Sequence, residues 1–250
     1  MVILFSIINL YCDSELSVST EREVPNAKRF PYPYSTGQFA LYYTPLDSSS
    51  IPAIADSVAK YSSQILQHLA VDSIDTVKIY FHLTYAELDA AVQDVVPDLP
   101  SWAIGLATAK NAIHMISPKH PDYEYGYMIV VLIHEYVHCV TLNIKSNFGN
   151  NPRWLWESIA LCEAGQLVDP RNIPYMVSHT PPTMTELNSF SNTYIYDVGY
   201  LLAEYIVTQW DYDHLRSLIV NNGNTTATLG MTSSQFHAAW FEFIKAKYGI

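Results

Sequence analysis

"VVLIHEYVHCVTL", residues 130–142, is the stretch that decides how this chain is interpreted. An apolar run is interrupted by His134, Glu135 and His138, whose polar side chains need partners if the segment is buried. Valine, leucine and isoleucine occupy most of the other positions, so a helix here is apolar nearly all round and lies inside the protein. The three polar residues are then either hydrogen-bonded members of the core or the surroundings of a metal ion.

The spacing of the two histidines favours the metal. On a helix, His134 and His138 lie on one face, one turn apart, and both imidazoles can bind one ion. Glu135 lies beside them, where it can reach a metal-bound water. The pattern is HExxH, a zinc metallopeptidase motif in which the glutamate is the general base. A catalytic zinc usually has three protein ligands and one open position, so a third ligand is expected elsewhere.

The position of the third ligand distinguishes classes of such sites. One extended pattern requires Gly and then His after the motif, but this chain has Thr141 and Ile144 there, which excludes that class. Eighteen residues separate His138 from Glu157, which lies in "PRWLWESIALCEAG", residues 152–165. This arrangement, HExxH-x18-E with a "WLxE…A" helix, resembles the gluzincin metallopeptidases. The nearest likeness is to their aminopeptidase-like branch and to the small peptidase MA-like domains.

The resemblance covers roughly residues 40–250 in the order of elements. The residues of the second helix that match are Trp154, Leu155, Glu157 and Ala160. Ser158 departs from the glycine common in the family, and Leu161 stands where some members have an acidic residue. Support for the metal-binding histidines must therefore come from elsewhere. The family implies an α+β, zincin-like fold, with a small mixed sheet packed on the active-site helix and a mainly helical part after it.

The family also implies the roles of the site residues. His134, His138 and Glu157 are expected to bind one Zn²⁺ per chain, and Glu135 is expected to act as general base. Glu163 is a rival third ligand. It lies about 240° round the same helix from Glu157, so only one of the two can face the ion. Glu157 is preferred because it carries the family spacing.

A further element of the aminopeptidase branch is Tyr-x-x-Gly, whose phenol stabilises the tetrahedral intermediate. Tyr196 and Gly199 fit it. Tyr194 and Tyr200 are alternatives for that role, and packing in the core is another role open to Tyr196. The family's element for a free amino terminus, Gly-x-Met-Glu-Asn, is missing from the sequence, so exopeptidase activity is not supported.

Gluzincins bind the substrate backbone along an edge strand beside the active-site helix. Residues 111–117 precede that helix and are expected to form this strand, where an extended peptide pairs by strand addition. His114 lies in this segment and is interpreted as structural.

The composition is that of a globular protein, with 49% hydrophobic and 15% charged residues. The net charge of −11 gives no electrostatic basis for binding nucleic acid. The cysteines, Cys12, Cys139 and Cys162, exclude a disulfide scaffold and a CxxC metal pair. The last two lie in apolar helical stretches and are expected to be buried free thiols.

The first residues indicate export. "MVILFSIINL", residues 1–10, is too short to span a bilayer but fits the apolar part of a secretion signal. "NLYC", ending at Cys12, resembles a lipoprotein processing site, with Tyr11 in place of a small residue. Residues 1–37 are therefore expected to be a signal and tether, with a lipid anchor at Cys12 and a location in the cell envelope or outside the cell. The alternatives are an ordinary first strand or a misassigned start.

The remaining chain, residues 38–250, is expected to be one metallopeptidase domain, with the sheet and active-site helix in 38–145 and a helical part in 146–250. Patterns of apolar residues predict strands at 38–46 and 76–84, a strand pair or bent strand at 103–118, and helices at 48–71, 85–96, 127–142, 152–165, 196–210 and 233–249. A polar, proline-rich connection occupies residues 169–192.

The sequence thus predicts a zinc-dependent peptidase that hydrolyses peptide or protein substrates. One alternative is a non-catalytic zincin-fold protein of the cell envelope that acts as a binding module, although such a protein has no need of Glu135. Another is a tyrosine-rich carbohydrate- or protein-binding domain without metal. Neither alternative has a motif of its own in the sequence.

Overall fold

The computed structural model describes residues 32–250. The predicted secretion signal and the lipid anchor at Cys12 lie outside these residues and stay predictions. The strands of the described chain form one mixed sheet in the order β1-β2-β3-β5-β4. Their bounds are β1 (Tyr32–Thr36), β2 (Phe39–Tyr43), β3 (Val77–His82), β4 (Gly105–Ala109) and β5 (Ala112–Ile116). β2, β3 and β5 run parallel, and β1 and β4 pair antiparallel at the two edges.

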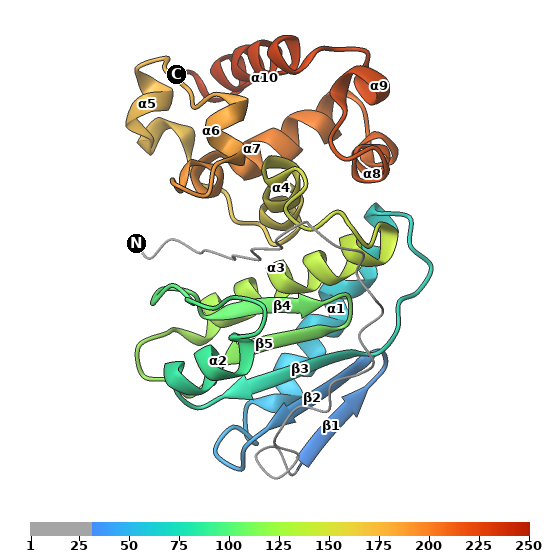
Figure 1. The fold of residues 1–250 in the computed structure, drawn as a ribbon, viewed down its shortest axis with the longest axis vertical. Helices are drawn as coiled ribbons and strands as arrows, with labels where there is room; N and C mark the ends of the chain where they lie inside the picture. Colours follow the sequence, from blue (N-terminus) through green and yellow to red (C-terminus); the bar gives the residue numbers. More distant parts are fainter. Residues whose placement is uncertain (1–31) are drawn as a thin grey trace.

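Two helices, α1 (Ile51–His68) and α2 (Tyr85–Val92), lie between strands in the chain, and the other helices follow the last strand. These are α3 (Tyr125–Ile144), α4 (Arg153–Glu163), the 3-10 turn η1 (Pro170–Asn172), α5 (Pro174–Val177), α6 (Met184–Asn188), α7 (Tyr194–Gln209), α8 (Tyr212–Val220), α9 (Thr225–Leu229) and α10 (Ser233–Tyr248). From α3 onward the described chain is helical, and this part stacks against the sheet layer (Figure 1). The predicted α+β class, with a mixed sheet first and a helical part second, is confirmed.

One face of the sheet packs on α1 and α3. The register places Leu41, Ile79 and Ile113 side by side on this face, and all three are fully buried. α3 lies close to β4, because a side chain added at Gly105 would meet Val131 of α3 at 2.9 Å. The sheet therefore packs against α3, the helix that carries HExxH (Figure 1).

The opposite face carries a row of stacked rings. Tyr80 stacks on Tyr42 at 4.7 Å between centroids and on His114 at 4.9 Å. His114 also lies 2.9 Å from His82, Nδ1 to Nε2, and both histidines are buried. Because alternate residues of a strand face opposite ways, this pair points away from α3. His114 therefore packs against other residues of the sheet, which agrees with its interpretation as a structural residue.

α3 is the central helix of the protein. By length and composition it could cross a membrane, but 72% of its most apolar window is buried inside the fold. The core helix of a globular domain has the same character. Cys139 on α3 is a buried free thiol as predicted, whereas Cys162 on α4 is only half-buried.

Several predicted boundaries differ from the structure. β1 begins at Tyr32, inside the segment 1–37 predicted as a tether, so the fold starts earlier. The 169–192 connection contains η1, α5 and α6, whereas the 103–118 stretch is the predicted strand pair, β4 and β5. α8 and α9 were not predicted, although Asp211 and Asn224 cap their first turns with side-chain hydrogen bonds.

The expected position of the edge strand was wrong. Residues 111–117 form β5, which lies between β3 and β4 and is interior to the sheet. β4 is the edge strand on the side of the sheet that contacts α3. Sequence spacing located the hairpin beside the active-site helix but did not determine which of its two strands pairs with β3.

Candidate metal centre

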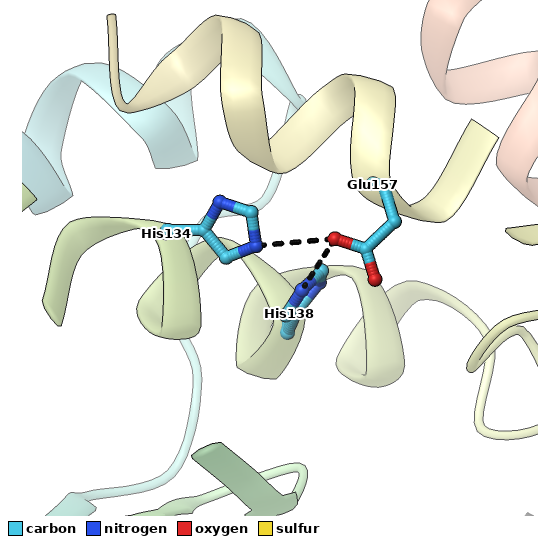
Figure 2. Close-up of side chains that lie close together, drawn as sticks. All are labelled: His134, His138 and Glu157. Atoms are coloured by element: carbon cyan, nitrogen blue, oxygen red, sulfur yellow. Dashed lines mark ion pairs between the residues drawn. The ribbon is translucent and has the colours of Figure 1, made fainter. Parts of the chain in front are cut away.

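Two helices supply the candidate ligands. α3 carries His134 and His138 one turn apart, and α4 presents Glu157 to both of them (Figure 2). Oε2 of Glu157 lies 3.3 Å from Nε2 of His134 and 3.8 Å from Nε2 of His138. One ligand atom from each residue falls within 4.8 Å of the other two. The sequence spacing predicted this grouping, and the structure brings all three side chains together.

The donor set fits a metal ion. In a tetrahedral zinc site, ligands about 2.0–2.1 Å from the ion are about 3.3 Å from one another, close to the separations here. The three side chains have no exposed surface. Within residues 32–250, the Nε2 atoms of His134 and His138 and both oxygens of Glu157 make no hydrogen bond that meets normal geometry. Buried polar atoms without such partners are costly, and a shared cation would satisfy all of them.

The protonation of the two histidines differs. Burial alone lowers the pKa of His134, but the adjacent Glu157 carboxylate and the charge of Glu135 outweigh it, so this pKa is raised. Burial and the neighbouring His134 place the pKa of His138 well below its ordinary value. His138 is therefore a neutral imidazole at physiological pH, the form that binds metals.

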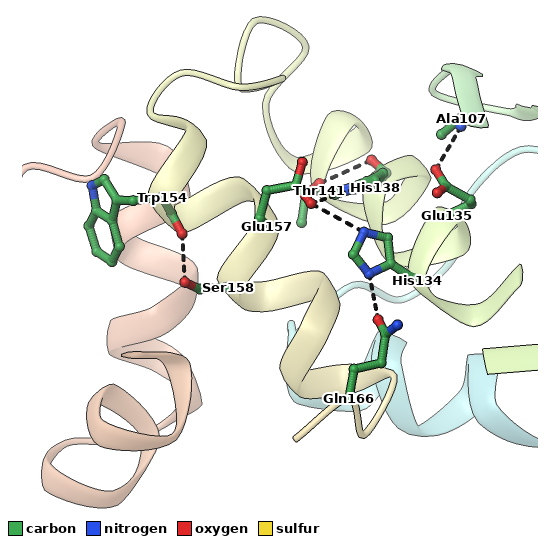
Figure 3. Close-up of polar contacts among 9 residues, drawn as sticks. All are labelled: Ala107, His134, Glu135, His138, Thr141, Trp154, Glu157, Ser158 and Gln166. Atoms are coloured by element: carbon green, nitrogen blue, oxygen red, sulfur yellow. Dashed lines mark hydrogen bonds and ion pairs between the residues drawn. The ribbon is translucent and has the colours of Figure 1, made fainter. Parts of the chain in front are cut away.

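Each histidine has a different second partner. Nδ1 of His134 lies 2.7 Å from Oε1 of Gln166, which follows the end of α4 (Figure 3). The ring of His138 stacks on Trp156, with centroids 4.0 Å apart and planes 2° from parallel. Sequence analysis anticipated support from somewhere other than Leu161 but did not identify Gln166 or Trp156.

Glu135 lies on the side of α3 that faces the sheet edge. Its Oε2 accepts a 2.8 Å hydrogen bond from the backbone N–H of Ala107, in β4 (Figure 3). Cys139, one turn later, donates to the carbonyl of Ala109 at 3.4 Å. The expected general base is thus in contact with the edge strand and one residue away from the first ligand.

Glu163, the rival ligand, is engaged elsewhere. Its carboxylate lies 2.9 Å from Nδ1 of His68, at the end of α1, and this ring stacks on Tyr212. Burial raises the pKa of Glu163, and contact with His68 opposes the shift. Glu163 therefore links α4 to α1, and Glu157 is the carboxylate of α4 that reaches the histidines.

Tyr196 is affected electrostatically by Glu157, the third member of the triad formed by His134, His138 and Glu157. Burial and then the charge of Glu157 raise the pKa of its phenol well above the ordinary value, while Arg153 opposes the shift. The guanidinium of Arg153 lies 5.3 Å from the centre of the Tyr196 ring. At neutral pH the phenol keeps its proton and can donate it in a hydrogen bond.

The alternative tyrosines point to other surroundings. Tyr194 is 37% exposed and packs edge-on against Tyr175. Tyr200 is half-buried, and its pKa is raised by burial and then by the nearby Cys162, Glu204 and Glu163. Tyr196 is the phenol of this segment whose pKa is raised by the charge of Glu157.

No protein-family model, curated protein or solved structure matches the chain. The class of the site therefore rests on its residues: a buried group of two histidines and one glutamate that could hold a metal ion.

Proposed function

We propose that the protein is a zinc-dependent peptidase of the gluzincin type, which hydrolyses peptide bonds in peptide or protein substrates. The observation that carries the proposal is the buried group of His134, His138 and Glu157, with Glu135 next to it. When bound, zinc polarises the scissile carbonyl and lowers the pKa of a coordinated water toward neutrality.

The other residues take roles that follow from their positions. Glu135 accepts the proton of the attacking water and passes it to the leaving amine. Its hydrogen bond to Ala107 holds the carboxylate against β4. The protonated phenol of Tyr196 donates a hydrogen bond to the oxyanion that forms at the substrate carbonyl.

The substrate is proposed to bind along β4. This strand is at the edge of the sheet and contacts α3, so an extended peptide that pairs with it lies beside the triad. Binding there requires Glu135 to share or release the N–H of Ala107. The bound peptide then forms an additional strand at this edge of the sheet.

One observation favours a second candidate, a metal-binding module without catalysis. His134, Glu135, His138 and Glu157 are all fully buried, and closed sites are typical of structural rather than catalytic zinc. The presence of Glu135 favours the peptidase, because a structural site needs no base beside its ligands.

Metal analysis combined with cleavage of a peptide library separates the two candidates. The peptidase predicts bound zinc, cleavage by the wild-type protein and no cleavage by Glu135→Gln at unchanged zinc content. Zinc without cleavage by either protein supports the module. A protein that neither contains nor takes up zinc contradicts both.

A further inference from the structure

Gln166 makes a specific contact with one of the candidate ligands. Its Oε1 lies 2.7 Å from Nδ1 of His134 (Figure 3). An amide oxygen only accepts hydrogen bonds, so Nδ1 carries a proton and Nε2 is the ring nitrogen left to bind a metal. That Nε2 faces Glu157 at 3.3 Å. The contact thus orients the ring and places the proton at Nδ1, as metal binding through Nε2 requires.

The end of α4 determines where Gln166 points. Gly165 has a φ of +69°, a left-handed conformation that most residues adopt only with strain. The N–H of Gly165 donates to the carbonyl of Cys162 at 3.0 Å, and the N–H of Gln166 donates to the carbonyl of Leu161 at 2.8 Å. This pair of hydrogen bonds is the usual glycine cap of a helix. It reverses the chain so that the Gln166 side chain returns to α3.

One helix therefore controls two parts of the centre. α4 supplies the third ligand, Glu157, and its terminal glycine turn supplies the partner of the first ligand, His134. A shift of α4 relative to α3 would displace the carboxylate and the supporting amide together. Gln166 adds no charge to the centre, because its amide is neutral. The carboxylates at this centre are those of Glu157 and Glu135.

We infer that Gln166 is a positioning residue of the metal centre, which holds the His134 ring with Nδ1 protonated and Nε2 directed at the ion. The role in metal binding rests on the proposed function, whereas the proton at Nδ1 does not. A neutral partner orients the histidine without adding a negative charge, in contrast to a carboxylate partner.

Zinc affinity, measured by competition with a chromophoric chelator at fixed pH, tests the positioning role. Gln166→Leu keeps the size of the side chain but removes the acceptor, and should weaken zinc binding by about 10–100-fold. Gln166→Glu restores an acceptor and should bind zinc within roughly threefold of wild type or more tightly. Equal weakening in both variants would overturn the role of the acceptor, and wild-type affinity in Gln166→Leu would overturn the inference altogether.

A matched control separates positioning from general loss of stability. Nε2 of Gln38 donates a 2.7 Å hydrogen bond to the hydroxyl of Tyr136, which is on α3 but is not a ligand. Gln38→Leu should leave zinc affinity within roughly threefold of wild type. If Gln38→Leu weakens binding as much as Gln166→Leu, the effect is not specific to His134 and the inference fails.

The Nδ1 proton is read in metal-free protein by long-range nitrogen–proton NMR of labelled histidines, with His134→Gln to assign the signal. Wild type should show a proton at Nδ1 of His134, and Gln166→Leu should show a smaller share of rings that carry this proton. An unchanged share in Gln166→Leu contradicts the inference even if the protein proves to bind no zinc. Absence of zinc with the predicted protonation at Nδ1 contradicts only the proposed function.

Discussion

The backbone N–H of Ala107 donates a 2.8 Å hydrogen bond to the carboxylate of Glu135, which joins the edge strand β4 to the residue that follows the first candidate ligand. The contact crosses from the sheet to α3 and is buried. It gives the carboxylate a fixed direction before any substrate is present. Preorganisation of this kind is typical of catalytic groups.

Glu135→Gln should abolish hydrolysis while the fold and the metal remain. The glutamine oxygen can still accept from Ala107, but the amide cannot take a proton from water. The expected loss of rate is at least about 10²–10⁴-fold, the usual contribution of general base catalysis. Cleavage of a peptide library is followed by mass spectrometry, and bound zinc is measured in the same samples. Full activity in this variant would contradict the proposed mechanism.

Glu157→Ala should lose most of its zinc affinity, whereas Glu163→Ala should not. Glu157 faces both histidines, and Glu163 contacts His68 instead. Removal of a ligand should weaken binding more than the roughly 10–100-fold lost with a residue that only supports a ligand. Chelator competition compares the two variants. Zinc binding lost in Glu163→Ala and kept in Glu157→Ala would reverse the ligand assignment.

Tyr196→Phe should bind zinc as wild type does but hydrolyse peptides more slowly. Loss of one oxyanion donor typically lowers kcat by about 10²–10³-fold, with little effect on KM when the contact forms only in the transition state. Tyr194→Phe and Tyr200→Phe are matched controls from the same helix and should keep wild-type kcat. If all three variants behave alike, Tyr196 has no special role and belongs to the packing of the core.

Gly199→Ala should destabilise the protein, because α4 and α7 approach closely at this residue. A Cβ there would lie 2.6 Å from Cδ1 of Leu161 and 3.4 Å from Cα of Ser158. The expected loss is about 1–3 kcal/mol in the free energy of unfolding. Gly126→Ala, in α3 with open space around it, should be neutral or stabilising by up to about 1 kcal/mol. Urea denaturation measures both, and equal stability of the two variants would contradict the packing argument.

His114 should make the protein less stable as the pH falls. Burial lowers the pKa of His114 to about 4, below the value of about 6.5 expected in the unfolded chain. Protons therefore bind the unfolded state more readily, and stability present above pH 6.5 is lost progressively between about pH 6.5 and 4. This histidine accounts for about 3 kcal/mol of that loss. His114→Gln should flatten the decline in urea denaturation across this range. An equally steep decline in the variant would contradict the assignment.

The sequence was most informative where a pattern is local. HExxH on an apolar stretch predicted α3, and the spacing to Glu157 predicted the third member of the group. Both depend on helix geometry, which the spacing of residues determines directly. Helix geometry predicted that only one of Glu157 and Glu163 faces the ion, and the family spacing favoured Glu157. The contact of Glu163 with His68 gives it another partner.

The features that sequence analysis missed depend on contacts between distant segments. β4 rather than β5 is the edge strand because β5 pairs with β3, and no local pattern encodes that choice. Pro33 and its polar surroundings suggested a tether, yet proline is tolerated in an edge strand such as β1. Gln166 reaches His134 only because α4 packs against α3. The glycine before it was the one available signal, since it predicts a helix end where the chain turns back.

Bound zinc in protein purified without added metal tests the central claim most directly. The account predicts about one zinc per chain in wild type, since the site has the ligand set of a single-zinc centre, and none in a variant that combines His134→Ala with Glu157→Ala. Wild-type protein that contains no zinc and takes up none on titration would contradict the account. His134, His138 and Glu157 would then be a buried polar cluster of the core.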